Sequence, residues 1–307
     1  MRRETGVSGQ YPQAVNVDAA QMPVSAWWDD ESVEWPLVLA IDSSSRTGSL
    51  AVLKGHTVVA EASWSAHGPG GSLHLDLATR LMADHGLRLS QVQGVVVATG
   101  PGSFTGTRAG ISVGQGIAEA LSIPLVGVPT LHGLVVQMTG YARVGDLACA
   151  LIAAGRGGVY AWAAVVGAQR FGSCGDPVTA TVQDVADALG AISSVSTGRV
   201  VIGGEIDAAQ ARIVLASVPE AAVLPPVVTQ RRAAWLAALA RPMLRGWHVQ
   251  SGIGADGRDG ETRWFPEDVQ PHYLVKADEP RAPNLGWHYP NFAEARSEEH
   301  TSELQSH

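Results

Sequence analysis

A glycine-rich segment at residues 100–110 carries the residue types that most clearly suggest a binding site. It reads GPGSFTGTRAG and directly follows the apolar run at 95–99. Glycines allow a tight turn and close backbone approach, and the N–H groups at the start of a helix attract anions. The residues that could hold a nucleotide or another anion are Gly100, Gly102, Ser103, Thr105, Gly106 and Arg108. A structural turn that packs a helix onto a sheet explains the same pattern, and the residues by themselves favour that reading.

The histidines and cysteines show no pattern of a metal site or an activated nucleophile. Two residues four apart share a helix face and can hold one ion, but the histidines at 56, 67, 74, 85 and 132 include no such pair. Neither a GxSxG elbow, a Walker A loop nor an HExxH helix occurs. Cys149 and Cys174 make no disulfide framework, which is typical of a reducing cytoplasm. We therefore predict no metal site.

The composition indicates an acidic, soluble protein. The 307 residues carry a formal net charge of -8, and 46% of them are hydrophobic. This charge argues against a broad basic surface that binds nucleic acid unaided. Residues 1–13 lack the apolar core of a signal peptide, and the longest apolar run, at 147–166, is broken by Gly155-Arg156-Gly157-Gly158. We expect a cytoplasmic protein that does not associate with membranes.

The order of the predicted elements indicates the fold. Strands are expected at 37–41, 49–54 and 57–64, followed by a helix at 72–85, a strand at 95–99, a helix at 108–121 and a strand at 125–128. Three strands in a meander and then helix, strand, helix, strand form the half-unit of the ribonuclease-H-like or actin-like architecture. We therefore predict an α/β protein with a two-lobed actin-like (ASKHA) fold, in which helices flank mixed sheets.

The predicted lobes cover most of the chain. Residues 37–132 form the first lobe, and residues 133–277 form a second, degraded lobe with a returning C-terminal segment. In the second lobe we expect strands at 147–153, 159–166, 199–202 and 272–276 and helices at 182–189 and 232–244.

The two ends of the chain look different from the lobes. Residues 1–36 are polar and without periodicity, which suggests a disordered extension or a mis-assigned translation start. Residues 278–307 form a polar tail. Its last part, 296–307, reads RSEEHTSELQSH, the translation of a common sequencing adapter, and we expect it to be an assembly artefact.

Asp42 ends the first predicted strand, ahead of a polar turn. In actin-like ATPases an aspartate in this place contacts magnesium-bound phosphate through water. The turn here lacks the glycine two residues on that a close phosphate loop prefers, so an Asx turn is the favoured role and nucleotide contact the alternative. Gly203-Gly204 lies where actin-like folds place an adenosine-contacting glycine pair, which is a weak signal.

The segment GPGSFTGTRAG resembles the hallmark of the TsaB family and of its catalytic paralogue family, TsaD. The resemblance is strong over 37–131, where it includes the strand and aspartate at 37–42, His74 and the segment 123–131. It continues thinly to residue 274, through Gly157-Gly158-Val159-Tyr160 and Pro271-His272-Tyr273-Leu274. The family's D-A-R motif corresponds to Ala153-Ala154-Gly155, with Arg156 displaced by one, and Val275 stands where the family has an arginine.

The missing histidine pair makes the chain more similar to TsaB than to TsaD, because TsaD-type proteins hold a metal through H-x-x-x-H. The resemblance implies a non-catalytic subunit of the complex that forms threonylcarbamoyladenosine on tRNA. Its implied partners are TsaD in a heterodimer and the ATPase TsaE, with a homodimer when the chain is alone and tRNA reached only through the complex. The resemblance implies no cofactor of its own, and ATP or ADP could bind at the interface with TsaD.

The resemblance also places the partner surface on the first-lobe helices at 72–85 and 108–121. Small residues on a helix let a partner helix approach closely, although each interior glycine costs about 1 kcal/mol relative to alanine. Contacts with a partner would compensate this cost. The predicted interface residues are His74, Leu77, Leu81, Ala109, Ser112, Gly116 and Ala118.

Two other functions stay open. An actin-like ATP-dependent kinase would need a second phosphate loop and acidic residues that the sequence does not offer. A glycoprotease-type peptidase would use Ser103 as nucleophile, although the residues that follow make this serine a helix cap.

Overall fold

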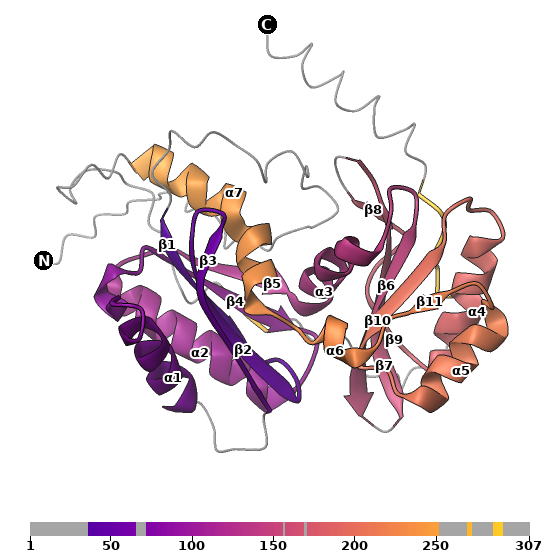
Figure 1. The fold of residues 1–307 in the computed structure, drawn as a ribbon, viewed down its shortest axis with the longest axis horizontal. Helices are drawn as coiled ribbons and strands as arrows, with labels where there is room; N and C mark the ends of the chain where they lie inside the picture. Colours follow the sequence, from indigo (N-terminus) through magenta and orange to yellow (C-terminus); the bar gives the residue numbers. More distant parts are fainter. Residues whose placement is uncertain are drawn as a thin grey trace, which may run out of the picture.

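The computed structural model describes residues 36–65, 72–155, 157–168, 171–251, 269–271 and 285–290. Within them the chain forms two sheets that lie in two lobes (Figure 1). The predicted extension at 1–35, the strand at 272–276 and the adapter-like end at 296–307 lie outside the described residues.

The first sheet has the strand order β3-β2-β1-β4-β5. Its strands are β1 (Leu37–Asp42), β2 (Thr47–Lys54), β3 (Thr57–Ser65), β4 (Gly94–Gly100) and β5 (Leu125–Pro129). β1, β2 and β3 are antiparallel, whereas β4 and β5 run parallel to β1. β1 and β4 are buried along their whole length, as expected for central strands with both faces covered. The predicted meander and crossover are therefore confirmed.

Two helices cover one face of the first sheet. These are α1 (Ser72–Ala83) and α2 (Phe104–Leu121), and the 3-10 turn Leu89–Gln91 precedes β4. Their apolar side chains form a core with those of β1, β2 and β4, including Leu39, Val97 and Ile111. α2 begins four residues before the predicted start at Arg108, because Ser103 rather than a later residue caps it.

The second sheet repeats the strand order of the first. It runs β11-β10-β6-β7-β8, with β9 also paired to β7. The strands are β6 (Leu147–Gly155), β7 (Gly158–Val166), β8 (Phe171–Ser173), β9 (Val178–Ala180), β10 (Val200–Gly204) and β11 (Ala222–Val223). β6 is antiparallel to β7 and parallel to β10, as β1 is to β2 and β4. The helices α4 (Val182–Ser193) and α5 (Ala208–Ser217) pack together on this lobe.

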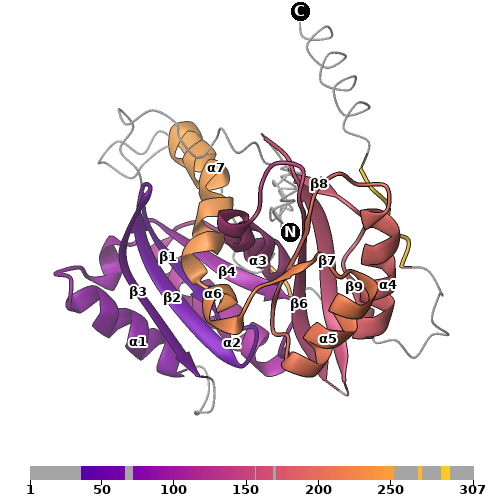
Figure 2. The same ribbon diagram turned by 45° about the vertical axis from the view of Figure 1, so that its right-hand side comes forward.

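Helices α3 (Thr130–Met138) and α7 (Ala233–Ser251) lie between the two sheets, as Figures 1 and 2 show. Every residue of α3 is buried, and one core cluster contains side chains from β1 and β4 as well as from β6 and β7. Helix α3 was not predicted, because a short helix that is buried on all sides, with polar Thr130, His132 and Gln137 among its residues, has no amphipathic period. α7 falls within the predicted second lobe by sequence but packs on β1, β2, β4 and β5 of the first sheet. The lobes therefore share one continuous core.

The described parts of the C-terminal region pack on both lobes. Val269 is buried in the core beneath α1 and α2, and Gln115 Nε2 donates to its carbonyl oxygen at 3.2 Å. Trp287 is buried in the second-lobe core, and its Nε1 donates to Asp176 O at 3.0 Å. The predicted polar tail at 278–307 is therefore wrong for residues 285–290, whose aromatic side chains belong to the second lobe. The fold as a whole is the predicted two-lobed actin-like fold.

Candidate functional site

Asp42 forms an Asx turn at the end of β1. The backbone N–H and the hydroxyl of Ser44 both donate to Asp42 Oδ1, at 3.0 and 2.7 Å. This is the turn role that the sequence favoured. A chain of hydrogen bonds then joins this turn to the glycine-rich segment: Gly100 N donates to Thr130 Oγ1 at 3.1 Å, and Thr130 Oγ1 donates to Ser44 Oγ at 3.0 Å.

Three glycines of the motif allow α2 to pack directly on the turn after β1. A Cβ added at Gly102 would lie 1.9 Å from Ser44 O, and one added at Gly106 would lie 2.1 Å from Ser43 O. At Gly110 the added atom would lie 2.4 Å from Ser43 Oγ. Real Cβ atoms do not approach other atoms so closely, so backbone oxygens leave room only for glycine at 102 and 106, while at 110 the Ser43 side chain would have to move. The glycine spacing of the motif is thus explained by helix packing.

The polar groups at the start of α2 are engaged within the chain. Ser103 Oγ accepts from Gly106 N at 3.2 Å as the helix cap, and Ser103 N donates to Ser44 O at 2.5 Å. The Arg108 guanidinium lies over the Phe104 ring, 4.0 Å from its centroid, on the exposed side of the helix. The structure therefore brings Gly100, Gly102, Ser103 and Gly106 close to the Asp42 turn, while Thr105 and Arg108 face away on the surface.

Arg231, which was not among the predicted site residues, reaches this turn from the segment between α6 (Pro226–Thr229) and α7. Its side chain is 5% exposed, and its Nε lies 3.4 Å from Asp42 Oδ2. Its terminal nitrogens donate to Ser44 Oγ and Ser45 Oγ and to Thr47 O. One signal was available in the sequence. Two arginines directly precede an apolar helix, a place where the helix dipole disfavours cations.

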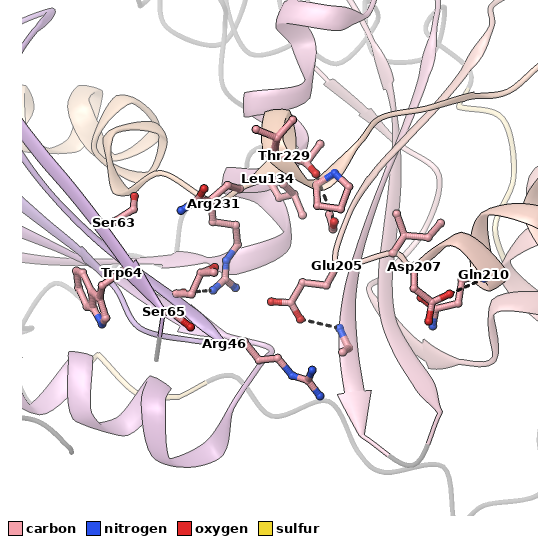
Figure 3. Close-up of a pocket in the computed structure, with 17 residues that line it drawn as sticks. Arg46, Ser63, Trp64, Ser65, Leu134, Glu205, Asp207, Gln210, Thr229 and Arg231 are labelled. Atoms are coloured by element: carbon pink, nitrogen blue, oxygen red, sulfur yellow. Dashed lines mark hydrogen bonds between the residues drawn. The ribbon is translucent and has the colours of Figure 1, made fainter. Parts of the chain in front are cut away.

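A cavity of about 720 Å³ separates the lobes beside Arg231 (Figure 3). The first lobe contributes Arg46 and Trp64, and the second contributes Glu205 and Asp207. Glu205 Oε2 accepts from Ala153 N at 3.2 Å, at the position that corresponds to the D-A-R motif. The cavity therefore has cationic and anionic groups on opposite walls.

Gly204, the second residue of the glycine pair at the end of β10, lines this cavity. Gly204 has a φ of +118°, and an added Cβ there would lie 2.1 Å from Leu151 O. At Gly203 the added atom would lie 2.5 Å from Thr229 Cγ2. Close packing of β10 against β6 and α6 accounts for both glycines, so their presence does not by itself indicate contact with adenosine.

The predicted partner surface divides into exposed and buried residues. On α2, Ser112 and Gly116 are exposed and Ala109 is half-buried, and on α1 Leu77 and Leu81 are half-buried. Two predicted interface residues are wrong. Ala118 is 1% exposed because it faces the first-lobe core, and His74 is 7% exposed because it packs on Trp64, with ring centroids 5.5 Å apart. Neither offers a surface to a partner.

Two kinds of feature are absent from the residues that the structure describes. Within these ranges, no group of three or more His, Cys, Asp or Glu side chains is arranged to hold a metal ion. Over the same part of the chain, no helix has the length and apolar character needed to cross a bilayer.

Comparisons with known proteins point to one family. The family described as TsaD, tRNA N6-adenosine threonylcarbamoyltransferase, matches residues 73–219. The tRNA threonylcarbamoyladenosine biosynthesis protein TsaB of Bacillus subtilis is 33% identical over 97 residues, 32% of this chain and 42% of the relative. TsaB of Escherichia coli is 32% identical over 94 residues, 31% of this chain and 40% of the relative. The matched region thus spans less than half the length of these curated relatives.

Solved structures share the fold over most of the chain. YeaZ from Pseudomonas aeruginosa has a TM-score of 0.53 at 23% identity, covering 78% of this chain and 100% of that one. A second Pseudomonas aeruginosa structure, of an uncharacterized protein with similarity to peptidase YEAZ, has a TM-score of 0.54 at 22% identity with the same coverage. By its partial sequence matches the chain is similar to TsaB and TsaD proteins, and it shares the two-lobed fold of YeaZ, so it is a TsaB/YeaZ-like chain.

Proposed function

We propose that the chain is a non-catalytic subunit of the machinery that forms threonylcarbamoyladenosine on tRNA, and that it binds and supports TsaD through α1 and α2. The names of the matching relatives supply the process. The observation that carries the binding role is the exposed face of α2, which lies within the matched residues 73–219.

This face is formed by residues spaced four apart on α2: Phe104, Arg108, Ser112 and Gly116, all exposed. The Phe104 side chain is 57% exposed, and a Cβ added at Gly116 would meet no atom within 4 Å. At one end of this face the Arg108 guanidinium stacks on the apolar Phe104 ring, and beyond it Ser112 and Gly116 leave a stretch of small residues on which a partner helix can pack closely. On α1, Leu75 is 41% exposed, and it adds apolar surface on the neighbouring helix.

The remaining parts of the proposal follow from the same role. TsaD would catalyse the transfer, with the ATPase TsaE as a further component and tRNA bound only through the complex. In the absence of TsaD, the same face would support a homodimer. ATP or ADP would bind at the interface with TsaD and not as a cofactor of this chain alone. The acidic net charge of -8 is compatible with an indirect contact to tRNA.

The test uses Gly116, because the position is open in the folded chain. Gly116→Arg places a long side chain on the proposed face while it increases helix propensity. We expect this variant to stay folded and to lose co-purification with a TsaD homologue from the same genome by at least tenfold. Gly116→Ala should keep most of the binding, because a methyl group adds little height to the face.

Val195→Arg is the matched control, because Val195 is 69% exposed and lies after α4 in the second lobe. It should bind TsaD as the unchanged chain does. Full binding by Gly116→Arg, with both variants folded, would refute the proposed face. Ala118 is not a suitable probe, because arginine at this core position would disturb the fold itself.

The alternatives have less support from the site. A kinase would need Asp42 for a magnesium nucleotide, but this carboxylate is already paired with Arg231. A peptidase would need Ser103 as nucleophile, but its hydroxyl oxygen caps α2. Phosphoryl transfer by the isolated protein would favour the kinase, and cleavage of a partner that depends on Ser103 would favour the peptidase.

A further inference from the structure

Four oxygen atoms converge beside the turn after β1, at the carboxyl ends of the parallel strands β1 and β4. In open α/β sheets this edge is where ligands bind. One of the four is a carboxylate oxygen, two are hydroxyl oxygens and one is a backbone carbonyl oxygen: Asp42 Oδ2, Ser44 Oγ, Ser45 Oγ and Thr47 O. Such a set of oxygens is typical of ligands that hold a hard divalent cation.

The Arg231 guanidinium lies among all four oxygens. Nη1 lies 3.1 Å from Ser44 Oγ, Nη2 lies 2.5 Å from Ser45 Oγ and 3.0 Å from Thr47 O, and Nε lies 3.4 Å from Asp42 Oδ2. A guanidinium is a cation with a planar set of N–H donors. Asp42 is 2% exposed, so its charge requires a partner within the protein.

The segment that carries Arg231 is held in place on its other sides. Gln137 Nε2, from α3, donates to Val228 O at 3.0 Å and to Gln230 O at 2.8 Å. Thr229 Oγ1 donates to Gly204 O at 3.3 Å in the second lobe. Arg231 therefore reaches the Asp42 turn from a connecting segment that hydrogen bonds hold in place between the lobes.

We propose that Arg231 is a built-in cation, which takes the place that a divalent metal ion would otherwise occupy at the Asp42 turn and which joins the two lobes there. The actin-like fold implies a magnesium nucleotide between the lobes. The residues present do not fit that group, because the oxygens that would surround its metal are already bound by the guanidinium. This inference does not depend on the proposed partner.

The experiment removes the guanidinium and asks whether a metal ion replaces it. Arg231→Gln should lower the melting temperature of the protein, and millimolar Mn²⁺ should raise it again. In a calorimetric titration, the Arg231→Gln variant should bind Mn²⁺ at least tenfold more tightly than the unchanged chain does. Asp42→Asn in the same background should abolish the Mn²⁺ response. Arg231→Lys, which keeps the charge, should respond to Mn²⁺ less than Arg231→Gln does.

Arg232→Gln is the matched control, because the neighbouring Arg232 pairs with Glu61 at the surface, where its own side chain is 48% exposed. It should melt close to the unchanged chain and should not respond to Mn²⁺. If Arg231→Gln is recovered only unfolded, its refolding yield with and without Mn²⁺ is measured, and rescue that requires Asp42 supports the proposal.

Three results would overturn the inference. The first is an Arg231→Gln variant that is folded or refolded without any Mn²⁺ effect. The second is an Mn²⁺ or magnesium–ATP response of the unchanged chain that Asp42→Asn removes. The third is an Mn²⁺ response of Arg231→Gln that persists in the Asp42→Asn background. A pull-down with TsaD reports on the proposed function, so the two ideas fail separately.

Discussion

Gly102 and Ser44 touch backbone to backbone: a Cβ added at Gly102 would lie 1.9 Å from Ser44 O. The contact joins the glycine-rich segment to the turn after β1, and it leaves no room for any side chain at position 102. The motif is therefore first of all a packing device, which holds the start of α2 against the edge of the first sheet.

Gly102→Ala should destabilise the protein by about 1–3 kcal/mol, because the new methyl group would meet Ser44 O, a backbone atom that cannot move aside as a flexible side chain can. Gly116→Ala is the matched control, since the site is exposed and open within the same helix, and it should stabilise the protein by up to about 1 kcal/mol. Urea unfolding measures both. Equal effects of the two substitutions would contradict the packing role.

The shared core predicts that the two lobes unfold together. Leu134, on α3, is 1% exposed in the cluster that spans both sheets. Leu134→Ala should cost about 2–5 kcal/mol, and amide hydrogen exchange should quicken to the same extent in β4 and β10 because both depend on this core. Loss of protection in one sheet alone would show that the lobes are separate cooperative units.

Trp287 should contribute to the stability of the second lobe, although it lies far along the chain from that lobe's strands. Its ring is buried and Gly175 lies against it, so Trp287→Ala should cost about 3–5 kcal/mol. The neighbouring His288 is exposed, and His288→Ala should change stability by less than about 0.5 kcal/mol. Thermal melting of the two variants tests this prediction. Indistinguishable melting temperatures would show that residues 285–290 do not contribute to the folded second lobe.

The two cysteines should be unreactive in the folded protein. Burial raises the pKa of Cys149 far above its ordinary value, with a further contribution from Cys174, and burial raises the pKa of Cys174 to about 12. Thiolate is the reactive form, so a thiol reagent at pH 8 should modify both residues only at the rate of unfolding. Rapid labelling of the native chain would contradict this.

The same shifts make stability depend on pH. Between the ordinary thiol pKa of 9.0 and the raised value, the unfolded chain has lost a thiol proton that the folded chain retains. The free energy of unfolding should therefore be unaffected by the thiols below that window, and it should fall as pH rises through it, by up to about 1.4 kcal/mol per pH unit for each thiol. Cys174→Ala should make the free energy of unfolding fall less steeply with pH in this window. An unchanged pH dependence would show that other groups cause it.

Local signals allowed the sequence to determine the first-lobe strands and helices, the second-lobe strands β6, β7 and β10 and the two-lobed fold, whereas the short strands β8, β9 and β11 were not predicted. The apolar runs of β1 and β4, the hairpin at Gly55 and the glycine-rich turn before α2 each depend on residues that are neighbours in the chain, so their conformations follow from local chemistry. The serine cap of α2 and the Asx turn at Asp42 were within reach for the same reason.

Tertiary structure alone decided which helix faces are buried and which charges are paired. Ala118 and Gly116 are both small residues on one helix, and only packing on the sheet makes the first a core residue and the second a surface residue. Arg231 and Asp42 are 189 positions apart, and the sequence around either residue does not indicate that the two pair. Their contact exists because α7 returns to the first sheet, and a return of that kind depends on the long-range burial of apolar surface and has no local signal.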